Sequence, residues 1–326
     1  MFFVLTIFAP MKRDLRIDSV KGILLILVIL GHVIEVSDNS SFSQKLYDFI
    51  YLFHMPLFIY ISGSLTKRKD DFKAFLSGLA YILIPYVIFQ SVHVAALLLQ
   101  GESFSMRHIV IPCWTLWYLL SLAYWKTGVQ VFANILNKYP LPILAVSIIL
   151  CLLCGGIPHG RVLSIQRTFH FLPFFLLGYY HGRGLIPCIS FRKPTSIIII
   201  GIVAIIVALG LLPDDVRWIL YGSMGYGTDR IFAKSFLMLC SFAMTFSFFS
   251  LVQENRILAS VGRDSLVYYM YHSLIIMYVL TPAIHRFHLP HDCIAFSLTY
   301  TLGILGLISV ARRFRPITFL ASPLKR

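Results

Sequence analysis

Long apolar runs dominate this chain, and several approach the length that crosses a bilayer. Residues 22–30 and 197–212 are apolar on every side, whereas a transmembrane β-strand would alternate polar and apolar residues. Hydrophobic residues make up 58% of the 326 residues and charged residues 13%, against about 45–50% and about 25% in soluble domains. Mean hydropathy is +0.80. This composition excludes a soluble enzyme, a disordered chain and a secreted disulfide scaffold. We therefore predict an all-α, polytopic integral membrane helical bundle.

About ten transmembrane helices are expected, at residues 20–36, 46–65, 74–99, 109–127, 140–156, 168–183, 195–212, 232–252, 265–285 and 292–311. With the N-terminus in the cytoplasm and alternating sides, 20 of the 28 Lys and Arg residues fall inside and 8 outside. Cytoplasmic loops carry such an excess, so both termini are predicted to be inside. We expect the longest loop, about 213–231, to hold a short interfacial helix.

A single membrane domain is expected, because no loop is long enough for a second one. We assign three segments: an N-terminal extension at 1–12, the integral membrane domain at 13–315, and a cytoplasmic basic tail at 316–326. The extension lacks the basic start of a signal peptide, and Met11 is an alternative start to Met1.

The net charge of +14 does not indicate nucleic-acid binding, because most basic residues lie at the ends of apolar runs, as membrane topology requires. Six cysteines are present, most of them in or beside apolar runs. Cys151 and Cys154 form a CxxC pair, but a zinc site needs a second pair or suitably spaced histidines. We interpret the cysteines as small buried side chains and expect no metal.

The first span carries one stripe of ionisable residues, which is expensive inside a bilayer and therefore a candidate functional site. Lys21 and His32 are eleven residues apart, so they point within about 20° of each other and lie about 16 Å apart along the helix. Asp18 and Glu35 fall close to the same direction. Alternatively, Lys21 snorkels to the interface and His32 is a hydrogen-bonded packing residue.

His54 in the second span is predicted at a depth similar to that of His32, about 12 Å from the outer surface. Two imidazoles at one depth can form a catalytic pair. Pro56 frees a backbone carbonyl and indicates a kink that lines a cavity with Ser62 and Gly63. The alternative is a structural histidine that caps this kink.

Three later residues are candidates for binding substrate. Arg167, at the outer end of the sixth span, can hold a phosphate or a developing oxyanion, or it can anchor the helix at the interface. Tyr268 and His272 share one face of the ninth span with Ser265. His272 is either a polar wall of the cavity or a satisfied core group. No Walker loop, GxSxG elbow, HExxH helix or dinucleotide fingerprint is present in the sequence.

These segments resemble the membrane-bound acyltransferase-3 family, and within it the fucose 4-O-acetyltransferase-like branch. Residues 16–32 are similar to the family's opening helix with its Arg/Lys-x10-His signature, in which Lys21 and His32 fill the two positions. Residues 53–58, followed by Ser62 and Gly63, are similar to the branch's second-helix motif. Weaker similarity occurs at residues 85–86, 114–119, 167–178 and 262–272.

The chain departs from the family's pattern in two places. Related proteins often carry a basic cluster at the start of the third helix, thought to meet coenzyme A phosphates, but residues 75–82 contain no Arg or Lys. A cluster just upstream is expected to take this role: Lys67, Arg68, Lys69 and Lys73. Longer relatives also carry an extracytoplasmic SGNH hydrolase-like domain that is absent here, so we expect transfer to finish in the membrane domain.

The resemblance implies a multi-pass O-acetyltransferase of the bacterial cytoplasmic (inner) membrane. It would move an acetyl group from cytoplasmic acetyl-CoA to a hydroxyl of a cell-surface or lipid-linked glycan, such as O-antigen, capsule or exopolysaccharide. The implied partners are the lipid bilayer and the glycan acceptor, and a homo-oligomer is compatible with the sequence. The resemblance leaves open which acyl group is transferred and which sugar accepts it. It also leaves open whether the acyl group passes directly to the acceptor or first forms an acyl-histidine intermediate.

The residue chemistry agrees with that implied activity. A buried imidazole can act as general base on a hydroxyl, which makes His32, with Glu35 and His54, the catalytic candidates. Lys21 and the 67–73 cluster offer positive charge to CoA phosphates. Arg167, Tyr268 and His272 are the substrate-binding candidates.

Two other functions stay open. A transporter or flippase would also place charged residues inside its helices, although no repeated half or matched pair of broken helices is recognisable in the sequence. A non-catalytic assembly subunit would not need the aligned Lys21–His32 stripe.

Overall fold

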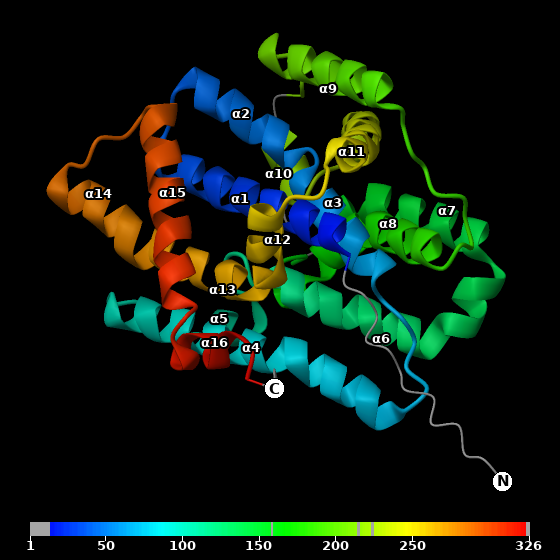
Figure 1. The fold of residues 1–326 in the computed structure, drawn as a ribbon, viewed down its shortest axis with the longest axis horizontal. Coiled ribbons are helices and arrows are strands. Elements are labelled where there is room, and N and C mark those ends of the chain that lie inside the picture. The colour runs from blue at the N-terminus through cyan, green and yellow to red at the C-terminus, as the bar shows by residue number, and fades with distance from the viewer. Residues whose placement is uncertain (1–13, 158, 214–215, 223–224, 324–326) are drawn as a thin grey trace.

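A computed structural model describes residues 14–157, 159–213, 216–222 and 225–323 (Figure 1). The predicted extension at 1–12 lies outside the described residues. Within them no strand forms, in agreement with the predicted all-α class. The α-helices are α1 (Leu15–Ser37), α2 (Ser41–Tyr51), α3 (His54–Ser64), α4 (Phe72–Leu99), α5 (Arg107–Val110), α6 (Trp117–Lys138), α7 (Pro140–Leu153), α8 (Ile165–Gly182), α9 (Lys193–Ala208), α10 (Val216–Tyr221), α11 (Ile231–Leu251), α12 (Arg256–Arg263), α13 (Ser265–Ile275), α14 (Thr281–Phe287), α15 (Ile294–Ala311) and α16 (Arg315–Ala321).

Among the described residues, six helical segments are long and apolar enough to cross a membrane: Leu15–Ser37, Ser41–Ser64, Phe72–Leu99, Ile231–Leu251, Ser265–Phe287 and Ile294–Ala311. Two shorter apolar helices, Pro140–Gly156 and Lys193–Ala208, fall on two more of the predicted spans. The remaining predicted spans, 109–127 and 168–183, correspond to α6 and α8. The chain is therefore a helical membrane protein, while the count of ten spans and the inside orientation of both termini stay predictions.

The helix expected at 109–127 begins later than predicted, at Trp117, and continues to Lys138. Pro112 lies in the preceding segment and has no backbone N–H to donate. Trp114 has a positive φ of 39°, which a helix does not accommodate. Residues 111–116 therefore form a non-helical connection, and this connection later contributes to the wall of a cavity.

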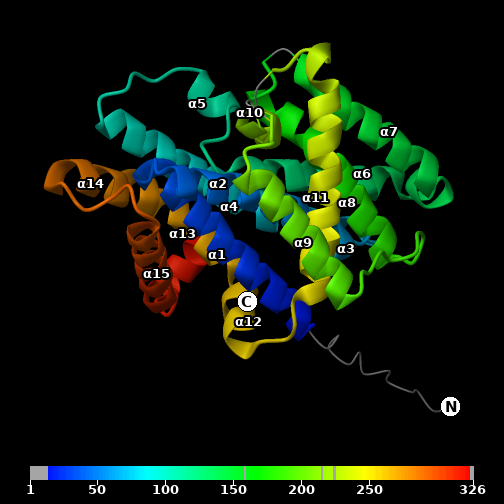
Figure 2. The same ribbon diagram turned by 90° about the horizontal axis from the view of Figure 1, so that it is seen from above.

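Helix α1 lies at the centre of the bundle, as both views show (Figures 1 and 2). It packs against α2, α3, α12, α13 and α15. Its close approach to α12 depends on two glycines, because a Cβ on Gly22 would overlap the Leu258 carbonyl and one on Gly262 would overlap the Asp18 carbonyl. Most residues of α1 are buried by these neighbours, which explains its all-round apolar sequence.

Helices α3 and α8 form a second close pair. A Cβ on Gly63 would overlap the Phe175 carbonyl, and one on Gly178 would overlap the Tyr60 carbonyl. Small residues let backbones approach in this way in membrane helix pairs. Tyr60 meets Gly178 and Ser64 meets Gly182, so the two helices run parallel, with the His54 end of α3 beside the first half of α8.

The second span is interrupted between α2 and α3, at residues 52–53. The interruption lies four residues before Pro56, whose missing N–H leaves the Leu52 carbonyl without its usual helical partner. The predicted kink is therefore present. Another irregular turn, the π-helical η4 (Ile276–Leu280), joins α13 to α14 just before Pro282. Such turns are frequent at functional sites.

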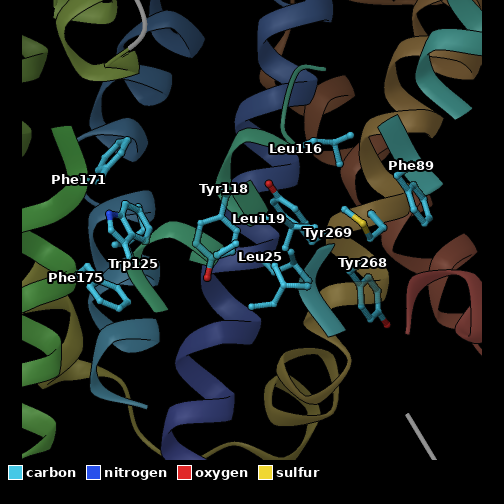
Figure 3. Packing of buried hydrophobic residues seen from close by; sticks show 14 of the residues in the cluster. Leu25, Phe89, Leu116, Tyr118, Leu119, Trp125, Phe171, Phe175, Tyr268 and Tyr269 are labelled. Atoms are coloured by element: carbon cyan, nitrogen blue, oxygen red, sulfur yellow. The ribbon is translucent and has the colours of Figure 1, made fainter. Parts of the chain in front are cut away.

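The large core cluster joins α1, α4, α6, α8 and α13 (Figure 3). Leu25 of α1, Tyr118 of α6 and Tyr269 of α13 lie close together in it. Trp125 stacks on Phe175 with ring centroids 5.2 Å apart, which fastens α6 to α8. Many large apolar side chains outside this core are exposed, as expected for a surface that faces lipid.

Part of the segment assigned to a basic tail is ordered. Helix α16 packs against α4 and α13. The Tyr271 hydroxyl donates to the Ile317 carbonyl at 3.1 Å, and the Tyr81 hydroxyl donates to Ser322 at 3.4 Å. These contacts connect residues 315–322 to the helical bundle.

Candidate functional site

A cavity of about 550 Å3 lies among α1, α3, α4, α8 and α10. Its size is in the range of small-molecule sites, and its wall is mostly apolar with a few polar groups. The described lining residues are Val28, His32, Glu35, Tyr51, His54, Met55, His93, Leu97, Arg107, His108, Ile111, Pro112, Cys113, Trp114, Thr115, Trp117, Gly160, Arg161, Ser164, Arg167, Phe171, Trp218, Leu220, Tyr221, Tyr269, Met277 and Tyr278. Four of the predicted site residues are among them: His32, Glu35, His54 and Arg167.

His32 and Glu35 form a hydrogen-bonded pair on the wall contributed by α1. His32 Nδ1 lies 3.0 Å from Glu35 Oε2. The Tyr51 hydroxyl lies 3.3 Å from the same Nδ1. When Nδ1 carries the proton and donates it to Glu35, Nε2 carries the lone pair. This pairing orients the imidazole as the carboxylate of a catalytic triad does.

Glu35 is held from a second side. Its Oε1 accepts a hydrogen bond from the Tyr221 hydroxyl at 3.2 Å. Helix α10 carries this tyrosine and lies outside the candidate membrane spans. Burial, and then the nearby Glu35 carboxylate, raise the pKa of Tyr221 to about 12. The phenol therefore stays protonated near neutral pH and acts as a donor to the carboxylate.

Aromatic rings enclose the His32 imidazole. The Trp114 ring centroid lies 4.4 Å from that of His32, and the His272 ring stacks on His32 at 5.6 Å. His272 Nδ1 lies 3.1 Å from the Tyr268 carbonyl, and within the described chain its buried Nε2 has no hydrogen-bond partner. His272 is not among the described lining residues, so it supports His32 from behind the wall.

His54 occupies the first turn of α3, directly after the interruption of the second span. Its Nδ1 donates to the Ile50 carbonyl at 2.8 Å. Its ring meets the edge of Tyr51 with centroids 4.6 Å apart. His54 therefore reaches the same cavity as His32, with Tyr51 in contact with both imidazoles.

Arg167 lies in the first turn of α8 and links the cavity wall to α10. Its Nε donates to the Tyr221 carbonyl at 3.1 Å, and its guanidinium lies 5.0 Å from the Trp117 ring centroid. A guanidinium fixed by stacking and a carbonyl is preorganised for planar anions. Arg167 thus holds the backbone of the same residue whose hydroxyl holds Glu35.

The other predicted residues lie elsewhere. Lys21 pairs with Asp18 at 3.7 Å on the first half of α1. The cluster of Lys67, Arg68, Lys69 and Lys73 is exposed at the connection between α3 and α4. Within it Arg68 donates to Asn134 at 3.1 Å. The Tyr268 hydroxyl hydrogen-bonds Ser309 of α15 at 2.6 Å, so it faces away from the cavity.

Comparison with known proteins identifies the family. A family model described as an acyltransferase domain, that of the acyltransferase-3 family, matches residues 14–311. The chain belongs to the acyltransferase-3 family. This match covers the helices from α1 through α15 and confirms the resemblance predicted from the first two spans. The fucose 4-O-acetyltransferase-like branch stays a prediction.

Two curated relatives are named as nodulation proteins. Nodulation protein NolL of Sinorhizobium fredii (strain NBRC 101917 / NGR234) is 32% identical over 190 residues, which are 53% of this chain and 50% of the relative. Nodulation protein NolL of Mesorhizobium japonicum (strain LMG 29417 / CECT 9101 / MAFF 303099) is 39% identical over 71 residues, or 21% of this chain and 19% of the relative. The alignments thus span half or less of these relatives' lengths. No solved structure matches this acyltransferase-3 chain at a significant level.

Tyr51 and Tyr221 are two of the site residues of this acyltransferase-3 protein that sequence reasoning missed. Tyr221 lies on a six-residue helix between spans, where hydropathy carries no information about its partners. The expectation of a short helix in the 213–231 loop located the right element but not its role. Tyr51 ends α2 just before the interruption, and its position three residues before His54 was the available signal.

Within the described residues, no group of three or more His, Cys, Asp or Glu side chains is arranged to hold a metal ion. Cys151, Cys154 and Cys240 are buried, as predicted, whereas Cys113 is half-buried and the prediction is wrong for Cys188 and Cys293, which are exposed; all six are free thiols. The arrangement of this acyltransferase-3 site offers acid-base chemistry from imidazole and carboxylate groups beside an arginine.

Proposed function

We propose that this acyltransferase-3 chain is a membrane O-acetyltransferase of the bacterial cytoplasmic membrane. It moves an acetyl group from cytoplasmic acetyl-CoA to a hydroxyl of a cell-surface or lipid-linked glycan such as O-antigen, capsule or exopolysaccharide. The observation that carries the proposal is the 3.0 Å contact between His32 Nδ1 and Glu35 Oε2 on the wall of the cavity. Apart from the family match, the proposal rests on an imidazole-carboxylate pair that is partly exposed at the wall of a ligand-sized cavity, and such a pair can activate a hydroxyl.

In this mechanism His32 is the general base. Its Nε2 takes the proton from the acceptor hydroxyl as that oxygen attacks the thioester carbonyl. The C–S bond then breaks, and the CoA thiolate leaves and receives the proton from His32. Glu35 stabilises the imidazolium that exists between these two proton transfers. His54 contributes a second polar group to the same wall.

The donor is proposed to enter from the other half of α1. Helix α1 is continuous, so Lys21 lies about 16 Å from His32 along its axis. An extended pantetheine arm can span such a distance while the CoA phosphates stay near Lys21. The exposed cluster formed by Lys67, Arg68, Lys69 and Lys73 supplies further positive charge for the phosphates.

The acceptor is proposed to occupy the part of the cavity near α8 and α10. Arg167 lies there with its guanidinium stacked on Trp117. His272 acts indirectly in this proposal, because it touches the His32 ring and not the cavity. Tyr268 was expected to bind substrate. Because its hydroxyl bonds Ser309, we instead propose that Tyr268 helps to pack α13 against α15.

A complementation experiment tests the proposal. A deletion strain is complemented with wild type, His32→Ala or His285→Ala at matched membrane protein levels, and O-acetyl esters on surface glycans are measured by mass spectrometry. His285 is exposed on α14 outside the cavity and serves as the matched control. Wild type and His285→Ala should restore the ester, and His32→Ala should not.

Other outcomes have distinct meanings. Restoration of the ester by His32→Ala would eliminate this histidine as the base. If no variant changes the ester and the protein moves substrate across proteoliposome membranes without acetyl-CoA, the proposed function is wrong and the protein is a transporter or flippase. Purified protein supplied with isotope-labelled acetyl-CoA would show directly whether the acetyl group is the one transferred.

A further inference from the structure

Positively charged residues outnumber negatively charged ones around the cavity. Among the described lining residues there are three arginines, Arg107, Arg161 and Arg167, and one carboxylate, Glu35. Glu35 is already engaged by His32 and Tyr221. Clefts that are lined by one sign of charge and have low-dielectric walls focus the electrostatic potential, so this excess of positive charge favours an anionic ligand.

The three arginines come from separate segments that the fold brings to one cavity. Arg107 begins α5, Arg161 immediately precedes the turn η2 (Val162–Ser164), and Arg167 lies on α8. Helix α5 packs against η2. Arg107 and Arg161 are both exposed side chains that line the cavity, which places them toward its open side, whereas Arg167 is partly buried.

The backbone around Arg161 is held in a costly conformation. His159, Leu163 and Ser164 have positive φ values of 54°, 50° and 60°, although none is glycine. Such residues persist where the surrounding structure imposes them, and they cluster at ligand sites. Here Ser164 is tied to Ser121 at 3.1 Å, and Gln166 N donates to the Gly160 carbonyl at 3.0 Å. These hydrogen bonds hold the backbone of the strained turn in place, and this turn positions Arg161 at the cavity.

We propose that Arg107, Arg161 and Arg167 form a subsite for an acidic group of the acceptor, a phosphate or a carboxylate attached to the sugar or its carrier. Guanidinium groups bind both anions in a planar, two-pronged geometry. Arg167 is the inner arm, because it is fixed by Tyr221 and Trp117 beside the His32–Glu35 pair. Anchoring the acid there orients the neighbouring hydroxyl toward His32.

This inference rests on the proposed function, and a binding measurement separates the two. Purified protein in detergent is titrated with glucose 1-phosphate, glucuronic acid and glucose, and ligand-induced thermal stabilisation gives apparent affinities. The two acidic probes should stabilise the wild type and glucose should not. Arg107→Gln and Arg161→Gln should each weaken binding of the acidic probes about tenfold. Rising salt should weaken binding further.

Controls keep the result independent of folding. Arg286→Gln removes an exposed arginine of α14 outside the cavity and should leave binding unchanged. Arg161→Lys retains the charge and should bind better than Arg161→Gln. Melting temperature without ligand reports whether each variant is folded.

A second titration with CoA and 3′-dephospho-CoA distinguishes the source of the anion. If Arg107→Gln and Arg161→Gln weaken CoA binding instead of sugar-acid binding, the arginines serve the donor and the acceptor subsite is wrong. Equal binding of glucose and glucose 1-phosphate, or no effect of either arginine variant, would also overturn it. If the acidic probes bind as expected but wild type restores no O-acetyl ester in the complementation experiment, the proposed function fails while the anion site remains.

Discussion

Glu35 Oε2 lies 3.0 Å from His32 Nδ1, one helical turn away on α1, while the other carboxylate oxygen accepts a hydrogen bond from Tyr221. The carboxylate is therefore fixed from both sides, by a residue of its own helix and by one from α10. Since Arg167 also donates to the Tyr221 carbonyl, the orientation of His32 depends on contacts between segments far apart in the sequence.

Glu35→Gln should reduce the rate of acetyl transfer strongly while leaving the helix intact. The amide preserves the shape of the side chain but cannot stabilise an imidazolium by charge. We expect kcat to fall by about 100-fold, with little change in KM for acetyl-CoA. Steady-state kinetics with labelled acetyl-CoA measures this, and Glu254→Gln, an exposed loop residue, is the control. Unchanged kcat would remove Glu35 from the mechanism.

Tyr221→Phe should have a smaller effect of the same kind. The substitution removes the hydrogen bond to Glu35 and the one shared with the Tyr47 hydroxyl, and it keeps the aromatic ring that packs on Tyr51 at 5.6 Å. A single hydrogen bond contributes about 0.5–1.5 kcal/mol, so kcat should fall by about 2- to 10-fold. The control is Tyr300→Phe, which removes a hydroxyl that donates to the Pro290 carbonyl. Neither residue is among the described lining residues of the cavity, so this substitution should leave kcat unchanged. An equal loss in both variants would contradict a specific role for Tyr221.

Gly178→Ala should destabilise the protein, because the added methyl group would overlap the Tyr60 carbonyl where α3 and α8 cross. Separating the helices or distorting them costs about 1–3 kcal/mol. Gly201→Ala in α9 is the matched control, because nothing lies within 4 Å of its added Cβ. Alanine there should be neutral or stabilising, since glycine is the poorer helix former. Thermal unfolding in detergent compares the two, and similar melting temperatures would show that this crossing tolerates a methyl group.

Neutralising the 67–73 cluster should weaken use of the donor. Replacing Lys67, Arg68, Lys69 and Lys73 with glutamine should raise KM for acetyl-CoA by about tenfold at low salt. The difference from wild type should shrink as ionic strength rises. The control replaces Arg313 and Arg315, which are exposed near α16, with glutamine. If both sets of substitutions change KM equally, the effect comes from overall charge and not from a docking site.

Residue spacing predicted the local parts of the site well. His32 and Glu35 are three residues apart on one helix, so helical geometry alone places them together, and the structure shows their contact. The proline four residues after Leu52 predicted the interruption that positions His54. Apolar run length predicted a helical membrane protein, and the first two motifs predicted its family.

Spacing was less informative where side chains of one helix meet different neighbours. Tyr268 and His272 are four residues apart on α13 and were expected to share the cavity. In the fold, His272 stacks on His32 whereas the Tyr268 hydroxyl bonds Ser309. Helix α13 packs against both α1 and α15, so adjacent positions on one stripe acquire separate partners.

The amino-acid sequence by itself determined that this protein folds in a lipid bilayer, which helices form, and that His32 and Glu35 lie together on α1. Each of these depends on local hydrophobicity and helical periodicity. Only the tertiary structure decided which groups surround that pair. Tyr51, Trp114, His272 and Tyr221 reach His32 or Glu35 from four other segments. Such contacts depend on how helices cross, and crossing is set by close approaches such as Gly22 on Leu258, which no periodicity in a single segment encodes.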